Sequence, residues 1–440
     1  MRSIPRFAGL DNGWKQPLAV LFAGLMVSAC GEQGRQQRGI EGSAGFAGQA
    51  ATAAGAGGAG GAGGAGGAGG GGGTPALADA SAPVAGAGGG AGGSAAVDAS
   101  APDASAPRDA GANDAAADAG PDAAPGSDAS TDGDGCNAAV LDPTSPPSSL
   151  ATTGDLGTHD PALIERDGVF HLWQTGRGLP AKTSTDLLRW QGAGAAFPNG
   201  NPGWISSQVP GATDLWAPDV SYFGGRFHLY YSASTFGSNR SCIGHATRDA
   251  IDSGSWSDQG PVVCSVTSDD FNAIDPNVIV DEEGTPWLSF GSFWDGIRMV
   301  RLDDGGARAD DEIHALASRG GGAIEAPFIV RRCGYYYLFV SFDRCCNGAS
   351  STYNQRVGRS QNVLGPYVDA EGRALMQSGG TLLVTGEGRW HGPGHNAVIF
   401  SGDRAYNVFH AYDGDNGGRS ILRVAELAWN ADGWPVSGGP

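Results

Sequence analysis

The sequence predicts an all-β fold, a five-bladed β-propeller, in its C-terminal part. Three observations favour this fold. Short runs of Val, Ile, Phe, Tyr and Trp alternate with Gly, Asp and Asn turns, which is typical of strands joined by tight connections. No segment longer than about ten residues keeps a helical apolar period. An ionisable residue close to a strand start recurs along the chain, as expected for diverged copies of one structural unit.

The copies set the number of blades. Their ionisable residues are Asp160, Asp219, Asp275, Glu325 and His395. Successive positions are 59, 56, 50 and 70 residues apart, and such a spacing holds the four short strands of one blade. A right-handed β-helix is the second architecture to consider, but its repeats are shorter and more regular. A β-sandwich does not explain the repeated acidic start.

Residues 1–30 resemble a lipoprotein-type signal peptide. A basic start precedes the apolar run Leu18 to Val27, which is too short to span a bilayer as a mature helix. Val27-Ser28-Ala29-Cys30 resembles a lipoprotein cleavage box, with Cys30 as the site of a lipid anchor. A cleaved signal with an incidental cysteine is the alternative. We expect an exported protein, either an outer-membrane or cell-surface lipoprotein or a secreted one.

Residues 31–140 are predicted to be a disordered, low-complexity linker. Gly/Ala repeats give way to Ala/Asp/Pro/Ser repeats, and almost no aromatic or branched residue is present to form a core. Burial cannot offset the entropy of ordering such a chain. The formal net charge of −19 comes partly from this linker. The remainder is only mildly acidic, so the composition predicts no nucleic-acid partner.

Residues 150–440 are predicted to be the propeller domain, which is large enough to bury one core. We expect it to be a monomer. The cysteine spacing fits no zinc pattern, and adjacent Cys345 and Cys346 cannot easily bond to each other. Export makes disulfides possible, but the sequence assigns no pairing. One hypothesis is that Cys136 pairs with a cysteine on the propeller surface and fixes the end of the linker.

The five ionisable residues have a common expected location. The first strand of each blade lines the central channel, so residues at strand starts should meet at one end of the axis. Each residue alone is explained by turn formation, because Asp-Pro and Asn favour turns. Four carboxylates at matching points of four repeats favour a shared site. Carboxylates among many aromatic side chains indicate glycoside hydrolysis, which needs one carboxylic acid and one carboxylate.

The surroundings of the carboxylates differ in the direction that this chemistry needs. Glu325 lies in the apolar segment AIEAPF, where desolvation favours the uncharged acid. Like-charge repulsion from a nearby Asp275 has the same effect. Asp160 has polar neighbours in THDP, so it should stay ionised. The predicted acid is therefore Glu325 and the predicted base is Asp160.

At these residues the sequence resembles the endo-α-1,5-L-arabinanases of glycoside hydrolase family 43. The matching segments include HDPALI, DLWAPDVSYFGG, NAIDPNVIVDEEG, LSFGSFWDGI, AIEAPFIVRR and GPGHNAV. The resemblance covers about residues 156–440. In that family, the combination of NAIDP, GSFW, IEAP, CC-x-G and GPGH separates the endo-arabinanases from the β-xylosidases and arabinofuranosidases.

The resemblance implies an inverting mechanism. Asp160 would be the general base, Glu325 the general acid, and Asp275 the residue that modulates the pKa of the acid and orients it. The substrate would be arabinan, a side chain of plant cell-wall pectin, cleaved at internal α-1,5-L-arabinofuranosidic bonds. In an inverting enzyme the acid and base lie about 6.5–9.5 Å apart, which leaves room for the attacking water.

Candidate substrate-binding residues come from two sources. Trp216, Phe236 and Trp294 are aromatic residues available to stack on sugar rings, although a place in the blade core is the alternative. The resemblance implies that residues 272–275 and 292–294 border the substrate. The resulting candidates are Trp216, Phe236, Asn272, Ala273, Ile274, Ser292, Phe293 and Trp294.

His395 resembles a residue near a metal ion, often calcium, in the central channel of the family. Calcium usually takes oxygen ligands, so one histidine with waters would be an unusual site. A structural histidine bonded to Asp275 or to water is the alternative. The resemblance implies no catalytic role for Asp219, which either holds the strand start of its blade or makes a hydrogen bond in a substrate subsite.

Two other functions stay open. An exo-acting β-xylosidase or α-L-arabinofuranosidase of the same family would have a pocket in place of an open groove. A carbohydrate-binding propeller without catalysis is disfavoured, because all three carboxylates of the expected active site are present.

Overall fold

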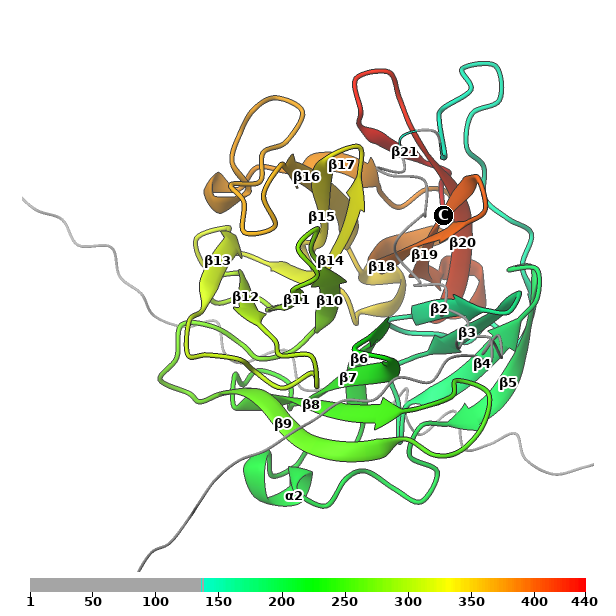
Figure 1. The fold of residues 1–440 in the computed structure, drawn as a ribbon. Coiled ribbons are helices and arrows are strands. Elements are labelled where there is room, and N and C mark those ends of the chain that lie inside the picture. The colour runs from blue at the N-terminus through cyan, green and yellow to red at the C-terminus, as the bar shows by residue number, and fades with distance from the viewer. Residues whose placement is uncertain (1–135, 137) are drawn as a thin grey trace, which may run out of the picture. The chain divides into compact units, whose positions relative to one another are not determined.

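Residue 136 and residues 138–440 are described by the structure, which is a computed structural model. They form five β-sheets arranged around one axis (Figure 1). The predicted all-β fold with five blades is thus confirmed. The predicted signal peptide and residues 31–135 of the predicted linker lie outside the described residues.

Each sheet is one blade, and its strands are mostly consecutive antiparallel neighbours. Blade 1 contains β1 (Thr153–Gly154), β2 (Ala162–Arg166), β3 (Val169–Trp173), β4 (Pro180–Ser184) and β5 (Arg189–Ala195). Blade 2 contains β6 (Leu215–Phe223), β7 (Arg226–Ala233), β8 (Ser241–Arg248) and β9 (Ser257–Ser265). Blade 3 contains β10 (Asn277–Val280), β11 (Pro286–Phe290), β12 (Ile297–Arg301) and β13 (His314–Ala317).

The last two blades follow the same order. Blade 4 contains β14 (Ile324–Arg332), β15 (Tyr335–Phe342), β16 (Asn354–Ser360) and β17 (Thr381–Val384). Blade 5 contains β18 (Trp390–Ser401), β19 (Arg404–Asp413), β20 (Arg419–Trp429) and β21 (Pro435–Ser437). The helical elements are short: α2 (Ile205–Gln208), η2 (Gly348–Ser350), η3 (Leu375–Gln377) and η4 (Gly414–Asn416). Among the described residues, none of the helices is long and apolar enough to cross a membrane.

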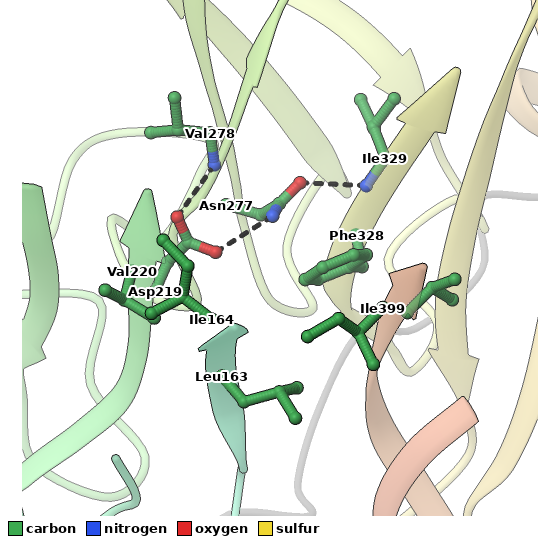
Figure 2. Close-up of a pocket in the computed structure, with 10 residues that line it drawn as sticks. Leu163, Ile164, Asp219, Val220, Asn277, Val278, Phe328, Ile329 and Ile399 are labelled. Atoms are coloured by element: carbon green, nitrogen blue, oxygen red, sulfur yellow. Dashed lines mark hydrogen bonds between the residues drawn. The ribbon is translucent and has the colours of Figure 1, made fainter. Parts of the chain in front are cut away.

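The first full-length strand of every blade faces the axis. A cavity of about 20 Å³ on the axis is lined by two residues from each of β2, β6, β10, β14 and β18, and Figure 2 shows most of these side chains. This volume is about what one water molecule needs. Apolar side chains such as Leu163, Phe328 and Ile399 line the channel at this level, together with the polar Asp219 and Asn277. The inner strands therefore meet in a packed core, and their starts lie at one end of the axis.

Apolar clusters join each blade to the next. Trp173 of blade 1 packs with Leu229 of blade 2, and the boundaries that follow are built in the same way. The last cluster closes the ring, because Trp190 of blade 1 packs with Leu422 and Val424 of blade 5. Trp190 is 1% exposed. Burial of this kind stabilises a fold by roughly 25 cal/mol per Å² of apolar surface.

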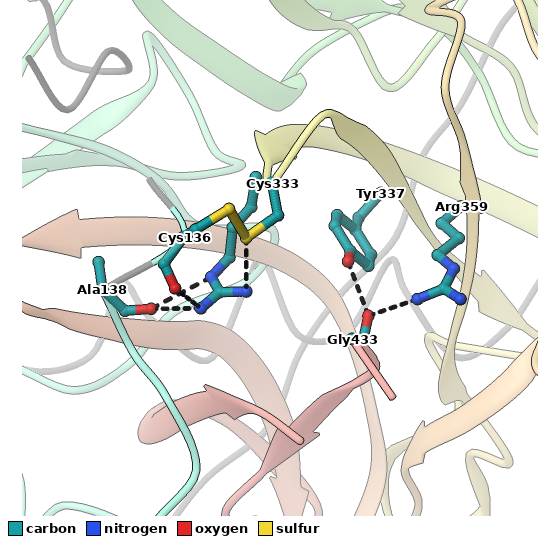
Figure 3. The surroundings of a disulfide bond; sticks show 7 residues. Cys136, Ala138, Cys333, Tyr337, Arg359 and Gly433 are labelled. Atoms are coloured by element: carbon teal, nitrogen blue, oxygen red, sulfur yellow. Dashed lines mark hydrogen bonds between the residues drawn. A yellow bond between two sulfur atoms is a disulfide. The ribbon is translucent and has the colours of Figure 1, made fainter. Parts of the chain in front are cut away.

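A strap formed by residues 138–157 lies along blade 5 and leads into blade 1. The backbone N–H of Leu150 donates to Val424 at 2.8 Å, and β1 pairs in parallel with β5. A disulfide joins Cys136 to Cys333 in the turn between β14 and β15 (Figure 3). The hypothesis that Cys136 pairs with a propeller cysteine is confirmed. A second disulfide, Cys242–Cys264, links β8 and β9.

Candidate active site

A left-handed backbone conformation marks the start of every blade. Asp160, Ala217, Asp275, Ala326 and His395 have φ angles of 49°, 43°, 58°, 57° and 50°. Non-glycine residues rarely adopt such angles, because the Cβ atom crowds the following backbone. In blades 2, 4 and 5 the strand register shifts at the same point. Strained residues and bulges of this kind occur near active sites, where they redirect side chains.

The residues that occupy equivalent positions in the five blades are these left-handed residues, and not the five ionisable ones. Asp160, Asp275 and His395 belong to both sets. Glu325 lies one residue before Ala326, and Asp219 lies two residues after Ala217. The prediction that the five ionisable residues occupy equivalent positions is therefore wrong for Glu325 and Asp219, although Glu325 still lies close enough to Asp275 to affect its pKa. A shift of one residue turns a strand side chain to the other face, and a bulge that causes it is not visible in sequence spacing.

Asp219 lies in the channel, below the strand starts. Its carboxylate accepts hydrogen bonds from the amide of Asn277 at 2.9 Å and from the backbone N–H of Val278 at 3.1 Å. Asn277 in turn accepts the N–H of Ile329 at 2.8 Å, as Figure 2 shows. Asp219 is 3% exposed. These bonds tie the inner strands of blades 2, 3 and 4 together, so Asp219 has a structural role.

The N–H group of each left-handed residue has a partner from a neighbouring blade. In four blades the acceptor comes from, or directly follows, the second long strand of the preceding blade. The pairs are Ala217 with Thr175, Asp275 with Ser232, His395 with Ser341, and Asp160 with His410, at 2.8, 2.9, 2.8 and 3.1 Å. In blade 4 the N–H of Ala326 donates to the carboxylate of Asp275 at 3.0 Å.

Asp160 is a buried carboxylate surrounded by donors. Its Oδ2 accepts from His159 Nδ1 at 2.8 Å and from the Thr175 hydroxyl at 2.6 Å. Its Oδ1 lies 3.2 Å from His395 Nδ1. Burial alone raises the pKa of Asp160, but the hydrogen bond from His159 and the ion pair with His395 outweigh burial and hold this pKa well below its usual range. Asp160 is therefore ionised, as its polar neighbours predicted.

Glu325 is held by two hydroxyl groups. Its Oε2 accepts from Ser292 at 2.6 Å, and its Oε1 accepts from Tyr353 at 2.7 Å. Burial raises the pKa of Tyr353 well above its ordinary value, so this hydroxyl keeps its proton and remains a donor. Glu325 is 7% exposed. The two hydroxyls fix the carboxyl group in place while leaving it at the end of the channel that Asp160 also faces.

Asp275 interacts electrostatically with both of these carboxyl groups. Burial is the main cause that raises its pKa to about 8, opposed by His395 and reinforced by the negative charges of Glu325 and Asp160. The site thus contains one carboxylate that stays ionised and one that holds a proton near neutral pH. Such divergent titration of neighbouring carboxyl groups is typical of acid–base sites.

His395 faces Asp160. Burial lowers its pKa, but the negative charge of Asp160, followed by Asp275 and Glu325, outweighs this and raises the pKa to about 9. A protonated imidazole has no lone pair for a metal ion, so the groups here that suit a hydrated divalent cation are the nearby carboxylate oxygens. Calcium next to His395 would bind through these oxygens and water, in competition with the proton on His395.

A second group has the composition of a metal site. Ligand atoms of His159, Asp160 and His410 lie within 4.8 Å of one another. However, His410 Nδ1 accepts the backbone N–H of Asp160, and His159 Nδ1 donates to the carboxylate. Burial also lowers the pKa of His410 well below its usual value. Because both nitrogens are engaged in hydrogen bonds, this trio is a hydrogen-bonded cluster around the carboxylate.

The candidate substrate-binding residues fall into two groups. Trp216 of β6 and Phe236 of the β7–β8 loop lie together, with ring centroids 4.8 Å apart, and Phe236 is 59% exposed. Phe293 and Trp294 are half-buried in the β11–β12 loop. These four offer rings near solvent, as sugar stacking requires.

The remaining candidates are buried supports. Asn272, Ala273 and Ile274 are 3%, 0% and 7% exposed. Ala273 packs in the apolar cluster between blades 2 and 3, and Ile274 accepts the N–H of Gly291 at 2.8 Å. Ser292 contacts Glu325 directly. These four residues therefore support the loop beside Glu325 and expose little surface to which a substrate could bind.

Sequence reasoning missed the side chains that hold the carboxylates. Thr175, Tyr353, His410 and Tyr412 come from strands after the first one of each blade, or from their ends. The two tyrosines fall within the general strand pattern, and nothing in the sequence singled out Thr175 or His410. His159 was noted only as a polar neighbour of Asp160. The position of His159 directly before a predicted base is the one signal that could have indicated its contact.

Comparison with known proteins decides the family. The model for "Glycosyl hydrolases family 43" matches residues 155–435. The chain belongs to glycosyl hydrolase family 43. Residues before 155, which include most of the strap, lie outside the matched region.

Individual relatives of this family 43 chain cover the same domain. An extracellular endo-α-(1→5)-L-arabinanase of Bacillus subtilis is 41% identical over 284 residues, which are 63% of this chain and 86% of the relative. An extracellular exo-α-(1→5)-L-arabinofuranosidase of Cellvibrio japonicus is 40% identical over 296 residues, 63% of this chain and 85% of the relative. A solved family 43 endo-arabinanase of Bacillus licheniformis has 45% identity and a TM-score of 0.62, and it covers 65% of this chain and 99% of its own. The chain is thus a glycoside hydrolase related to arabinan-degrading enzymes.

Proposed function

We propose that this glycoside hydrolase is an inverting endo-α-1,5-L-arabinanase. The observation that carries the proposal is the convergence of Asp160, Asp275 and Glu325 at one buried end of the propeller axis. In this proposal Asp160 acts as general base, Glu325 as general acid, and Asp275 as the residue that modulates and orients the acid.

The base role of Asp160 is supported by its charge. Its Oδ1 and Oδ2 are surrounded by His159, His395 and the Thr175 hydroxyl, which together keep the carboxylate ionised. An ionised carboxylate can take a proton from water as that water attacks the anomeric carbon. The proton passes from the water oxygen to Asp160, while the water oxygen forms the new bond.

The hydrogen bonds that hold Glu325 in place support its role as the acid. Ser292 and Tyr353 hold one oxygen each, and the Ser292 hydroxyl can rotate to accept when the carboxyl carries a proton. Asp275 contributes in two ways, since it binds the backbone directly after Glu325 and places a second titrating carboxyl beside it. Glu325 delivers its proton to the leaving glycosidic oxygen in the same step that Asp160 accepts one.

Arabinan is the proposed substrate because relatives near 40% identity are named for α-1,5-linked arabinan. The exposed Phe236 beside Trp216 offers an aromatic wall for a sugar ring. One relative is an endo-arabinanase and another an exo-arabinofuranosidase, so exo action on the same linkage is the second candidate. The endo proposal is favoured by the segments NAIDP, GSFW, IEAP and GPGH.

The test measures two quantities on linear arabinan. Endo action predicts that viscosity falls much faster than reducing ends appear, with oligosaccharides as early products. Exo action predicts a slow fall in viscosity and one small product from the beginning. Xylan and an aryl arabinofuranoside serve as parallel substrates, and cleavage of these alone would reject the arabinanase proposal.

We also propose calcium near His395 and export of the chain. A bound cation there would supply positive charge beside the carboxylates of Asp160 and Asp275. The relatives are named extracellular, which supports export. A lipid anchor at Cys30, with residues 31–135 as a spacer, follows from the sequence pattern alone.

A further inference from the structure

His159, directly before Asp160, lies in a continuous set of contacts. Its Nδ1 is 2.8 Å from Asp160 Oδ2, and its Nε2 is 2.8 Å from the hydroxyl of Tyr412. Its ring stacks on His410, with centroids 4.0 Å apart. The Tyr412 hydroxyl also accepts the backbone N–H of Cys346 at 2.8 Å. A chain of hydrogen bonds thus runs from the β15–β16 loop, through β19, to the proposed base.

The direction of each hydrogen bond follows from the groups that take part. An ionised carboxylate only accepts, so Nδ1 of His159 carries a proton. Tyr412 is completely buried, and its oxygen already accepts from Cys346. Its own hydrogen needs an acceptor, because a buried donor without a partner is costly. Among the described hydrogen bonds of this hydroxyl, His159 Nε2 is the acceptor, so the imidazole holds its proton on Nδ1.

The β15–β16 loop also contacts the proposed acid. Cys346, early in this loop, holds Tyr412, and Tyr353 at its end donates to Glu325 Oε1 at 2.7 Å. One loop of blade 4 therefore holds the base through a tyrosine of blade 5 and the acid through a tyrosine of its own. A rigid loop in this position sets both partners of an inverting pair relative to each other.

We propose that His159 and Tyr412 are positioning residues that fix which oxygen of Asp160 faces the attacking water. The inference rests on the proposed function, in which Asp160 is the general base. Oδ2 is occupied by His159 and by the Thr175 hydroxyl. Among the described contacts, Oδ1 has one close donor, His395 Nδ1 at 3.2 Å, so Oδ1 keeps a lone pair that can take the proton from water. Rotation of the carboxylate would exchange the two oxygens, and the bond from His159 opposes this rotation.

A purely structural role for His159 is the competing explanation, because Thr175 also donates to Oδ2 and the His159 ring packs on His410. The two explanations differ in what Tyr412 does. If His159 only fills space, the hydrogen bond from the Tyr412 hydroxyl to His159 has no effect on the carboxylate of Asp160. If His159 positions the base, loss of that hydroxyl affects turnover, and only through His159.

The experiment uses the full chain and three variants. Tyr412→Phe keeps the ring and removes the hydroxyl. His159→Asn keeps an N–H donor near the place of Nδ1 and removes the acceptor that faces Tyr412. The double variant completes a thermodynamic cycle. Tyr230→Phe is the matched control, since Tyr230 is equally buried and its hydroxyl donates to Gly306 at 2.8 Å, at the boundary of blades 2 and 3.

Kinetics are measured on the glycoside that the wild type cleaves, so failure of the arabinan assignment leaves this test intact. Tyr412→Phe should lower kcat roughly 10- to 100-fold with little change in KM, as expected for a displaced catalytic group. Tyr230→Phe should leave kcat unchanged. In the His159→Asn background, Tyr412→Phe should have no further effect. An equal loss in both backgrounds, or wild-type kcat in Tyr412→Phe, would overturn the inference.

A second readout does not depend on activity. In ¹⁵N-histidine-labelled full chain, the His159 signals are those absent from His159→Asn. They should show a protonated Nδ1 and an unprotonated Nε2, and Tyr412→Phe should shift the Nε2 signal. A proton on Nε2 and none on Nδ1 would contradict the proposed chain of hydrogen bonds.

Discussion

The Oδ2 atom of Asp275 accepts the backbone N–H of Ala326 at 3.0 Å, and Ala326 directly follows Glu325. At the other four blade starts a hydroxyl or an imidazole takes this place. Blade 4 is thus the one described blade whose start is held by a carboxylate. Asp275 therefore fixes the backbone that carries the proposed acid and adds a titrating group beside it.

Because of Asp275, the folded chain should become less stable as the pH rises. Burial raises its pKa in the folded chain to about 8, from an ordinary 3.8. Between these values the folded state binds a proton that the unfolded state has lost, so stability falls with increasing pH, by at most about 1.4 kcal/mol per pH unit. Asp275→Asn keeps an oxygen for Ala326 and removes the titration. Its Tm should exceed that of the wild type by more at pH 8 than at pH 4.

The activities of two Asp275 variants test whether this residue also positions Glu325. Asp275→Asn keeps the hydrogen bond to Ala326 but removes the titrating carboxyl group, whereas Asp275→Ala removes both, so Asp275→Ala should lose more activity. A Tm difference that is constant between pH 4 and pH 8 would contradict the raised pKa. Equal activity of the two variants would show that the bond to Ala326 does not position Glu325.

The Cys136–Cys333 disulfide should be a major contributor to stability. It closes a loop with a sequence separation of 197 residues, compared with 22 for Cys242–Cys264. Loss of a native disulfide typically costs about 2–5 kcal/mol, and longer loops are expected to lie at the upper end. Cys136→Ser/Cys333→Ser should therefore lower Tm more than Cys242→Ser/Cys264→Ser, measured by thermal unfolding without reductant.

A variant that weakens the strap but keeps the disulfide serves as the control for this prediction. Arg332 donates to the backbone oxygens of Cys136 and Ala138 and stacks on Trp429 at 4.9 Å. Arg332→Lys in the oxidised chain should weaken the strap while the disulfide persists, with a smaller loss of Tm. If Cys136→Ser/Cys333→Ser unfolds at the same temperature as the wild type, attachment of the strap through this disulfide does not contribute measurably to stability.

Much of the fold follows from the sequence, because each blade repeats the same strand pattern with turn residues between the strands. Asp160 and Asp275 were located by the Asp-Pro start, which corresponds to the left-handed turn in the structure. Asp219 was misplaced because the register shift between Trp216 and Asp219 moves it into the channel. Spacing along the chain does not record such a shift.

The contacts around the carboxylates could not be predicted for a different reason. Tyr353 and Tyr412 lie 28 and 252 residues from the carboxylates Glu325 and Asp160 that they support. Nothing in their local sequence distinguishes them from aromatic residues of the blade cores. Only the closure of the ring brings blade 5 beside blade 1 and places Tyr412 next to His159.

The buried pair His228 and His245 should make the protein sensitive to acid. His228 Nδ1 and His245 Nε2 are 2.9 Å apart, and burial lowers their pKa values to about 4 and about 3. Unfolding lets both bind protons below about pH 6.5. Stability is therefore complete above that pH and is lost as the pH falls towards 4.

The matching variant is His245→Gln, which retains a donor for His228. It should reduce the slope of unfolding free energy against pH by about 1.4 kcal/mol per pH unit between pH 6 and pH 4. Chemical denaturation at several pH values measures this slope. An unchanged slope would mean that His245 is already protonated in the folded state.

Removal of a bound cation tests the proposal for His395. Treatment with a chelator should lower Tm and activity, because the positive charge beside Asp160 and Asp275 is lost. Calcium should restore both better than magnesium, which demands a stricter octahedral shell. His395→Ala should no longer respond to calcium. Identical Tm values with chelator and with added calcium would reject a calcium site.

The assignment of base and acid is tested most directly by leaving-group dependence. kcat is measured for wild type, Asp160→Asn and Glu325→Gln on linear arabinan and on an aryl arabino-oligosaccharide with a nitrophenol leaving group. Both variants should lose about 10²- to 10⁴-fold on arabinan. Only Glu325→Gln should regain activity on the aryl substrate, because a good leaving group needs no acid. Equal losses of Glu325→Gln on both substrates, or recovery by Asp160→Asn alone, would contradict the account.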